Sequence, residues 1–108
     1  MNEADLLIVG AGCAGLSLAW NLVERGLDGR RLVLVDPRTE YARDRTWCFW
    51  NVIEHPFVDL VSHEWPRWRV RDHDGWVERW ASGLRYQHLR ADAFYERVRT
   101  RLEAADGV

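Results

Sequence analysis

Hydrophobic residues form two short uninterrupted runs near the start of the chain, at residues 6–9 and 32–35. Runs of this length without polar alternation are typical of strands that are buried on both faces of a parallel sheet. The segment between them predicts a mostly buried helix over residues 14–25, because its apolar positions recur at helical spacing. These positions are Leu16, Ala19, Trp20 and Val23. The order strand, helix, strand predicts a βαβ unit over residues 1–37, with a right-handed crossover.

The pattern changes in the middle of the chain. Residues 38–51 show no clean period of 2 or 3.6, and we interpret residues 38–66 as a loop region. Residues 67–81 alternate between apolar and polar on both sides of Asp72-His73-Asp74-Gly75. Alternation on either side of a turn that ends in glycine predicts a β-hairpin.

A second helix is predicted over residues 90–105, with Phe94, Val98 and Leu102 on one face. It is followed by a glycine turn of the kind that leads into another strand. We therefore expect the chain to be the amino-terminal piece of a larger protein, cut before its fold is complete. The predicted fold class is α/β: a Rossmann-like nucleotide-binding βαβ unit with a β-hairpin insertion.

Composition and charge narrow the function classes. The chain has 108 residues, of which 47% are hydrophobic and 30% charged, as in a soluble globular protein. Its net charge of −2 gives no basic field that would argue for nucleic acid. Its two cysteines fit no secreted disulfide pattern, and its histidines show no metal-ligand spacing. These features favour a cytoplasmic protein without a metal site.

The candidate chemistry lies in a glycine-rich loop between the first strand and the first helix. Glycine at position 10 permits a tight turn, glycine at 12 lets the backbone approach a pyrophosphate, and glycine at 15 lets the helix pack close to the strand. A pyrophosphate would then lie on free N–H groups at the positive end of the helix dipole. The predicted phosphate-binding loop is Gly10-Ala11-Gly12-Cys13-Ala14-Gly15.

An acidic residue completes this nucleotide-binding pattern. Asp36 ends the second strand, about twenty residues after the loop, where a carboxylate can accept hydrogen bonds from ribose hydroxyls. We therefore place Asp36, Pro37 and Arg38 beside a bound dinucleotide. FAD is favoured because FAD-dependent folds often open with this unit at the amino terminus. NADP remains an alternative cofactor, since an arginine such as Arg38 at this position can accommodate a 2′-phosphate.

A second motif adds a family resemblance. Residues 44–50 read Asp-Arg-Thr-Trp-Cys-Phe-Trp. This motif, and its distance from the second strand, resemble those of the flavoprotein-type lycopene cyclases. The resemblance covers about residues 5–51, with a weaker similarity over residues 86–95. It implies bound FAD that is active when reduced, NADPH as a reductant, and ring closure at the ends of linear lycopene without net redox change. It also implies catalytic acids beyond Val108, so that this piece alone would be inactive.

Several residues outside the glycine loop are further candidates for cofactor contact. Trp47 could line the binding site of a flavin or polyene. Arg45 could reach a cofactor phosphate, and Arg90 could face the nucleotide from the start of its helix. Aromatic packing and solvated ion pairs are the ordinary alternatives. Four further tryptophans are expected to pack a hairpin face, or else to contact a membrane peripherally. They are Trp65, Trp68, Trp76 and Trp80.

Other functions share the same opening motif. An FAD-dependent monooxygenase or a geranylgeranyl reductase-like oxidoreductase is the nearest enzymatic alternative, and a non-catalytic nucleotide-binding module is an alternative of another class. The sequence alone leaves these open. Nothing in the pattern indicates an oligomeric state.

Overall fold

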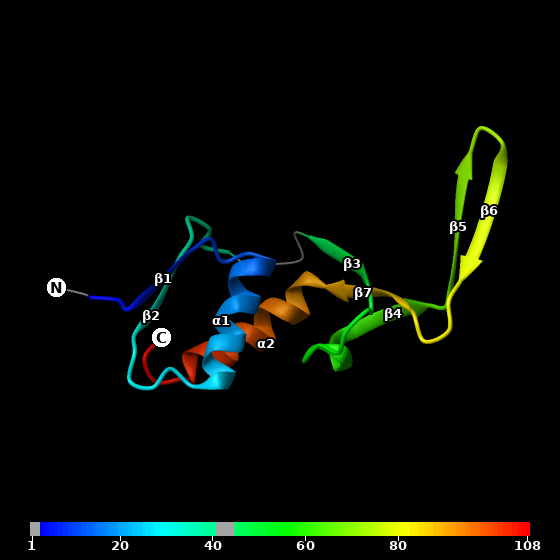
Figure 1. Cartoon of the computed structure of the whole chain (residues 1–108). Helices are drawn as coiled ribbons and strands as arrows, with labels where there is room; N and C mark the ends of the chain where they lie inside the picture. The colour runs from blue at the N-terminus through cyan, green and yellow to red at the C-terminus, as the bar shows by residue number, and fades with distance from the viewer. Residues whose placement is uncertain (1–2, 41–44) are drawn as a thin grey trace. The chain divides into compact units, whose positions relative to one another are not determined.

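The computed structural model describes residues 3–40 and 45–108, which form two compact units (Figure 1). The first unit comprises residues 3–40 and 95–108, and the second comprises residues 45–94. Helices and strands are mixed, and the strands form small sheets of two or three members. The protein is therefore an α/β structure in the broad sense. None of the helices in the described part of the chain is long and apolar enough to cross a membrane.

The first unit contains the predicted strand–helix–strand segment. β1 (Leu6–Val9) is followed by α1 (Cys13–Arg25) and β2 (Leu32–Val35). The two strands pair in parallel, with Leu6 opposite Leu32. Both strands have the predicted bounds, and the helix starts one residue earlier than predicted. Parallel pairing across an intervening helix brings the end of β1 and the end of β2 to the same edge of the sheet.

The two strands are less buried than their sequence predicts. In β1 only Ile8 is buried, whereas Leu7 and Val9 are 60% and 79% exposed. The expectation of strands buried on both faces is wrong for this sheet, because two strands leave most side chains without neighbours on one side. The core of the unit comes mainly from the helices and consists of Ile8, Ala11, Leu16, Ala19, Val23, Leu32, Tyr95, Val98 and Leu102.

The last helix, α2, spans Ala91–Glu103, and its residues from Tyr95 onward belong to the first unit. The predicted apolar face is buried. The helix is shorter than the predicted 90–105 at both ends. Arg101 Nε lies 2.8 Å from Glu24 Oε1, so an ion pair joins α2 to α1. Both side chains are more than a third exposed, so this pair adds little stability.

The second unit contains three strands that the sequence did not reveal as a sheet. β3 (Thr46–Trp50), β4 (Val61–Trp65) and β7 (Tyr86–Arg90) form an antiparallel sheet in the order β3-β7-β4. A short 3₁₀ helix, η1 (Val58–Leu60), precedes β4. The interpretation of residues 38–66 as a loop region is therefore wrong where β3 and β4 lie.

The composition of β3 explains why it was missed. Its burial alternates, with Trp47 and Phe49 half-buried and the other three residues exposed. Four of its five residues are apolar or aromatic, so hydropathy shows no period of 2. The strand is instead defined by its partner β7, where Trp47 lies opposite Leu89. Aromatic and β-branched residues favour such a pleated, half-buried surface.

A buried amide connects two other polar side chains in this unit. The Gln87 side chain is on β7 and only 2% exposed. Its Oε1 lies 3.0 Å from His55 Nε2, and its Nε2 donates to Glu64 Oε2 at 2.8 Å. The Phe57 N–H donates to His55 Nδ1, which places the imidazole proton on Nε2 and makes His55 the donor to Gln87. Both ends of the buried amide are thus satisfied.

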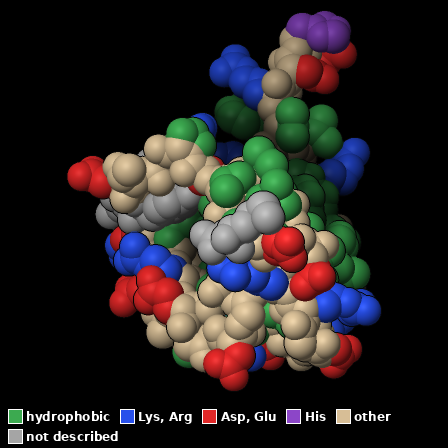
Figure 2. All heavy atoms as spheres, turned by 90° about the vertical axis from the view of Figure 1, so that its left-hand side faces the viewer, with side chains coloured by type: hydrophobic (Ala, Val, Ile, Leu, Met, Phe, Trp, Pro, Cys, Tyr) green, Lys and Arg blue, Asp and Glu red, His purple; other side chains and the backbone are tan. Residues whose placement is uncertain are grey.

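The predicted hairpin is present as β5 (Arg67–Asp72) and β6 (Gly75–Trp80), which pair antiparallel. Figure 2 shows acidic and histidine side chains gathered at its tip and basic side chains projecting below them. The expectation that four tryptophans pack its face holds only for Trp68, which is half-buried. Trp65 lies in β4, while Trp76 and Trp80 are 59% and 69% exposed.

Candidate functional site

The turn between β1 and α1 takes the conformation that its first glycine permits. Gly10 has φ of +99°, a conformation that residues other than glycine rarely adopt. Its N–H donates to the carbonyl of Val35 at 2.8 Å, so the loop leaves β1 while still attached to the end of β2. This geometry places the loop directly beside the residues that follow β2.

Gly15 marks the closest approach of the helix to the strand. A Cβ atom on this residue would lie 1.9 Å from the carbonyl oxygen of Gly10 and 3.3 Å from Ile8 Cγ2. The first of these atoms belongs to the backbone and cannot rotate away. Only glycine fits here, as the sequence pattern predicts for the third glycine of the motif.

The amino end of α1 has no side-chain cap among the described residues, and the Arg38 guanidinium lies close to it. Gly12 is the N-cap residue of the helix, and no side chain in the described part of the chain places a carboxylate in the first turn. Among the described residues, a Cβ atom on Gly12 would meet only Arg38 Nη2, at 3.6 Å. The first N–H groups of a helix have no partner within the helix and carry a partial positive charge. The start of α1, with Cys13 and Ala14 exposed, therefore has the features of an anion site.

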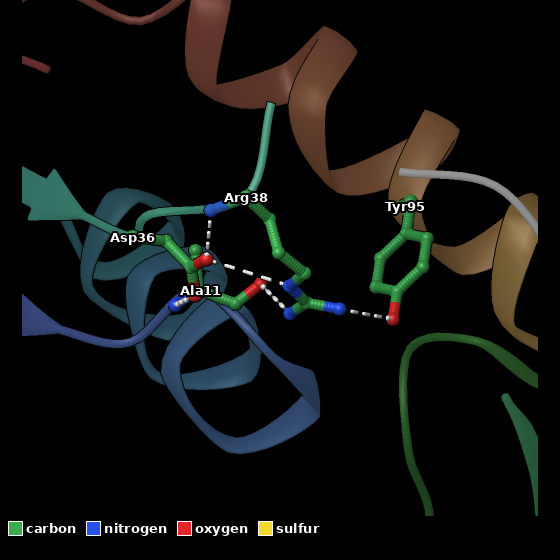
Figure 3. Close-up of polar contacts among 4 residues, drawn as sticks. All are labelled: Ala11, Asp36, Arg38 and Tyr95. Atoms are coloured by element: carbon green, nitrogen blue, oxygen red, sulfur yellow. Dashed lines mark hydrogen bonds and ion pairs between the residues drawn. The ribbon is translucent and has the colours of Figure 1, made fainter. Parts of the chain in front are cut away.

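Asp36 holds the loop and the chain after β2 together (Figure 3). Its Oδ2 accepts the N–H of Ala11 at 2.8 Å, and its Oδ1 accepts the N–H of Arg38 at 2.8 Å. These bonds, with the Arg38 N–H contributing most, lower the pKa of Asp36 below its ordinary value. The side chain is 12% exposed. It is therefore a fixed anion at the mouth of the glycine loop.

Arg38 lies across this loop. Its Nε is 3.4 Å from Asp36 Oδ1, and its Nη2 donates to the carbonyl of Ala11 at 3.2 Å. Its Nη1 lies 3.4 Å from the hydroxyl of Tyr95 on α2 (Figure 3). The Tyr95 contact is the main cause that raises the pKa of Arg38. The guanidinium is thus a fixed cation beside the loop, and Pro37 is exposed between it and Asp36.

Sequence reasoning missed Tyr95. The residue is buried next to the apolar face of α2, and a buried tyrosine hydroxyl usually has a hydrogen-bond partner. That rule could have indicated a polar partner without identifying Arg38, because the two residues are 57 positions apart in the sequence.

The remaining candidates belong to the second unit and have their own surroundings there. Arg45 is exposed, and Trp47 packs edge-on against Phe94 with ring centroids 5.2 Å apart. Arg90 ends β7, and α2 begins one residue later, at Ala91. Arg90 Nε donates to Asp92 Oδ1 at 3.0 Å, and this carboxylate raises the pKa of Arg90. Asp44, the first residue of the aromatic motif, lies outside the described residues.

A site for a metal ion has little support in the part of the chain that the structure describes. Three side chains that could offer ligands come together at Asp72, His73 and Asp74, and all three are exposed on the hairpin turn. Exposed acidic turns are common in proteins that bind no metal. The residues that the structure does bring together are the glycine loop, Asp36 and Arg38, and their arrangement suits a phosphorylated ligand.

Comparison with known protein families identified a match. A family model described as lycopene cyclase protein matches residues 5–108. Neither the curated proteins nor the solved structures contain a significant match. The match includes both the glycine loop and the aromatic motif at residues 44–50.

Proposed function

Because that match spans nearly the whole chain, the chain belongs to the lycopene cyclase protein family, and we propose that its first unit binds FAD for the cyclisation of lycopene. Membership of this family supports a lycopene cyclase-like activity for the chain. The cofactor, its contacts and the non-redox course of the reaction are our proposal. The observation that carries it is the amino end of α1 at Gly12, which no described side chain caps, with the ionised Asp36 beside it.

The residues of the loop fit the ADP half of FAD. Gly12 leaves room for a pyrophosphate to approach the backbone, since of the residues that the structure describes a Cβ there would meet only the Arg38 side chain. The N–H groups at the start of α1 would donate to its oxygens. Each carboxylate oxygen has two lone pairs, and Asp36 Oδ2 uses one for Ala11. The second lone pair of Oδ2 can accept a hydrogen bond from a ribose hydroxyl.

Arg38 contributes positive charge to the site but does not select NADP over FAD. An arginine that recognises a 2′-phosphate must direct its guanidinium outward to that group. Here Asp36, the Ala11 carbonyl and Tyr95 hold the guanidinium over the loop. In this position it offsets the negative charge of a pyrophosphate near Gly12. Asp36 would in turn repel a 2′-phosphate, so the ribose that it holds is the unmodified one.

The proposed reaction closes rings at the ends of linear lycopene. Protonation of a terminal double bond gives a carbocation, which cyclises and then loses a proton, so substrate and product are at the same oxidation level. Reduced FAD, kept in that state by NADPH, would supply negative charge that stabilises the cation in a dry pocket. The residues of this chain hold the cofactor in place: the loop binds the diphosphate, Asp36 orients the ribose and Arg38 balances the charge.

Expression of the full gene in cells that accumulate lycopene tests this function. We expect cyclic products by chromatography, and unchanged lycopene from the Gly12→Val variant, whose side chain would obstruct the pyrophosphate. A wild-type protein that retains flavin but leaves lycopene unchanged would contradict the cyclase while preserving FAD binding. A Gly12→Val protein that retains flavin as the wild type does would contradict the cofactor site.

A further inference from the structure

One face of the β5–β6 hairpin interleaves arginine and tryptophan. Residues directly opposite in an antiparallel pair, and alternate residues along each strand, share a face. The register sets Arg67 opposite Trp80 and Arg71 opposite Trp76, with a third pair between them. We call this surface the hairpin face; it consists of Arg67, Arg69, Arg71, Trp76, Glu78 and Trp80.

The hairpin face is exposed and carries an excess of positive charge. Trp76 and Trp80 are 59% and 69% exposed, which is unusual for large aromatic side chains. The guanidinium carbon of Arg69 lies 4.8 Å from the centre of the Trp76 ring, and that of Arg71 lies 5.7 Å from it. Three arginines stand against one carboxylate, Glu78, whose Oε1 is 3.7 Å from Arg67 Nη1.

The opposite side of the hairpin contacts the neighbouring sheet at its base, whereas Val70, further along that side, is 61% exposed. Trp68 projects from that side and packs against Trp50 of β3, with ring centroids 4.4 Å apart. Trp50 in turn lies 4.7 Å from the ring of Tyr86 on β7. This aromatic cluster fixes the base of the hairpin, so the hairpin face is not the side that packs onto the rest of its unit.

The tip of the hairpin has the opposite charge from its face. Asp72 and Asp74 flank His73, and the side chains of His73 and Asp74 are 88% and 82% exposed. An anionic surface would repel this tip and attract the three arginines. A ligand surface of that charge would therefore meet the hairpin along its face and not at its end.

We propose that the hairpin face is a docking surface for an anionic lipid bilayer. Tryptophan has an apolar body with a polar N–H and is enriched at the boundary between lipid and water, while arginine binds anionic head groups. Single-stranded nucleic acid is less suitable, because it needs open aromatic faces on which bases stack, and guanidinium groups already lie over Trp76. This inference goes beyond the proposed function and does not depend on it.

Flotation of the full protein with vesicles tests the docking surface. The vesicles are made of phosphatidylcholine alone or of phosphatidylcholine mixed with phosphatidylglycerol, and anisotropy with labelled poly-uridine runs in parallel. The variants are Arg69→Gln and the double change Trp76→Ala with Trp80→Ala. The matched control is Arg79→Gln, an exposed arginine of the same hairpin on its opposite face. Thermal unfolding checks that each variant is folded.

We expect the wild type to bind mixed vesicles in a salt-sensitive manner and to bind phosphatidylcholine weakly. Arg69→Gln should lower partitioning about fivefold, the tryptophan double variant should lower it further, and Arg79→Gln should lower it less than Arg69→Gln. No binding of the wild type to mixed vesicles would overturn the proposal. Equal loss in Arg79→Gln would overturn the assignment to this face, and tight poly-uridine binding without vesicle binding would replace lipid with nucleic acid.

Discussion

The two glycines at positions 12 and 15 should respond in opposite ways to the same added methyl group. In Gly15→Ala the new Cβ would lie 1.9 Å from the Gly10 carbonyl oxygen, so the loop and the start of α1 must move apart. In Gly12→Ala the new Cβ meets the end of the Arg38 side chain at 3.6 Å, which is an ordinary contact. Gly12 also has φ −89° and ψ −160°, which alanine adopts without strain.

These distances give the size of each effect. Overpacking against backbone costs about 3 kcal/mol for Gly15→Ala, which lowers Tm by about 6 °C or more. Gly12→Ala should change stability by less than about 1 kcal/mol, because the N-cap preference and the lower entropy of the unfolded chain oppose each other. It should nevertheless weaken FAD binding at least tenfold, since displacing the pyrophosphate loses one or more charge-assisted hydrogen bonds of about 1.5–3 kcal/mol each.

Differential scanning fluorimetry and titration with FAD, followed by flavin fluorescence, measure both effects in the full protein. Each variant is the control for the other, because both add one methyl group within the same loop. A Gly15→Ala protein with unchanged Tm would refute the packing argument. A Gly12→Ala protein with unchanged Tm and unchanged FAD affinity would refute the position of the diphosphate.

Two further predictions concern polar contacts. Because the pKa of Asp36 is lowered in the folded protein, its contribution to stability is complete above the ordinary value of 3.8 and is lost as pH falls through the lower folded value. Asp36→Asn should therefore lower the free energy of unfolding at neutral pH, and the difference from the wild type should shrink in acid. Urea unfolding that shows the same difference between variant and wild type at about pH 7 and about pH 3 would contradict this. Gln87→Leu should lower the free energy of unfolding by about 1–3 kcal/mol, because His55 Nε2 loses its buried acceptor and Glu64 loses a donor. A Gln87→Leu protein as stable as wild type by urea unfolding would show that this network is not required.

The parts of the fold that sequence predicted are those set by local contacts. β1, α1 and β2 follow from apolar runs and helical spacing, and the role of Gly15 follows from its contact with Gly10, five residues away. The hairpin was predictable for the same reason, since its strands meet across a short turn. In these segments the pattern and the packing partner lie close together in the chain.

The parts that sequence did not predict depend on distant partners. β3 became a strand through β7, which follows it some forty residues later, and its uniformly apolar sequence carried no alternation of its own. The Arg38–Tyr95 contact and the Gln87–His55 contact join residues 57 and 32 positions apart. Arg90 was assigned to a helix because its strand was not recognised. Pairings of this kind are set by the tertiary fold, which hydropathy does not encode.

A crystal structure of the full protein with FAD would test the central claim most directly. We predict that the diphosphate lies against the N–H groups at the start of α1, within hydrogen-bonding distance of the backbone near Gly12, and that a ribose hydroxyl donates to Asp36. Density for the diphosphate away from this loop, with the start of α1 covered by protein side chains, would contradict the account.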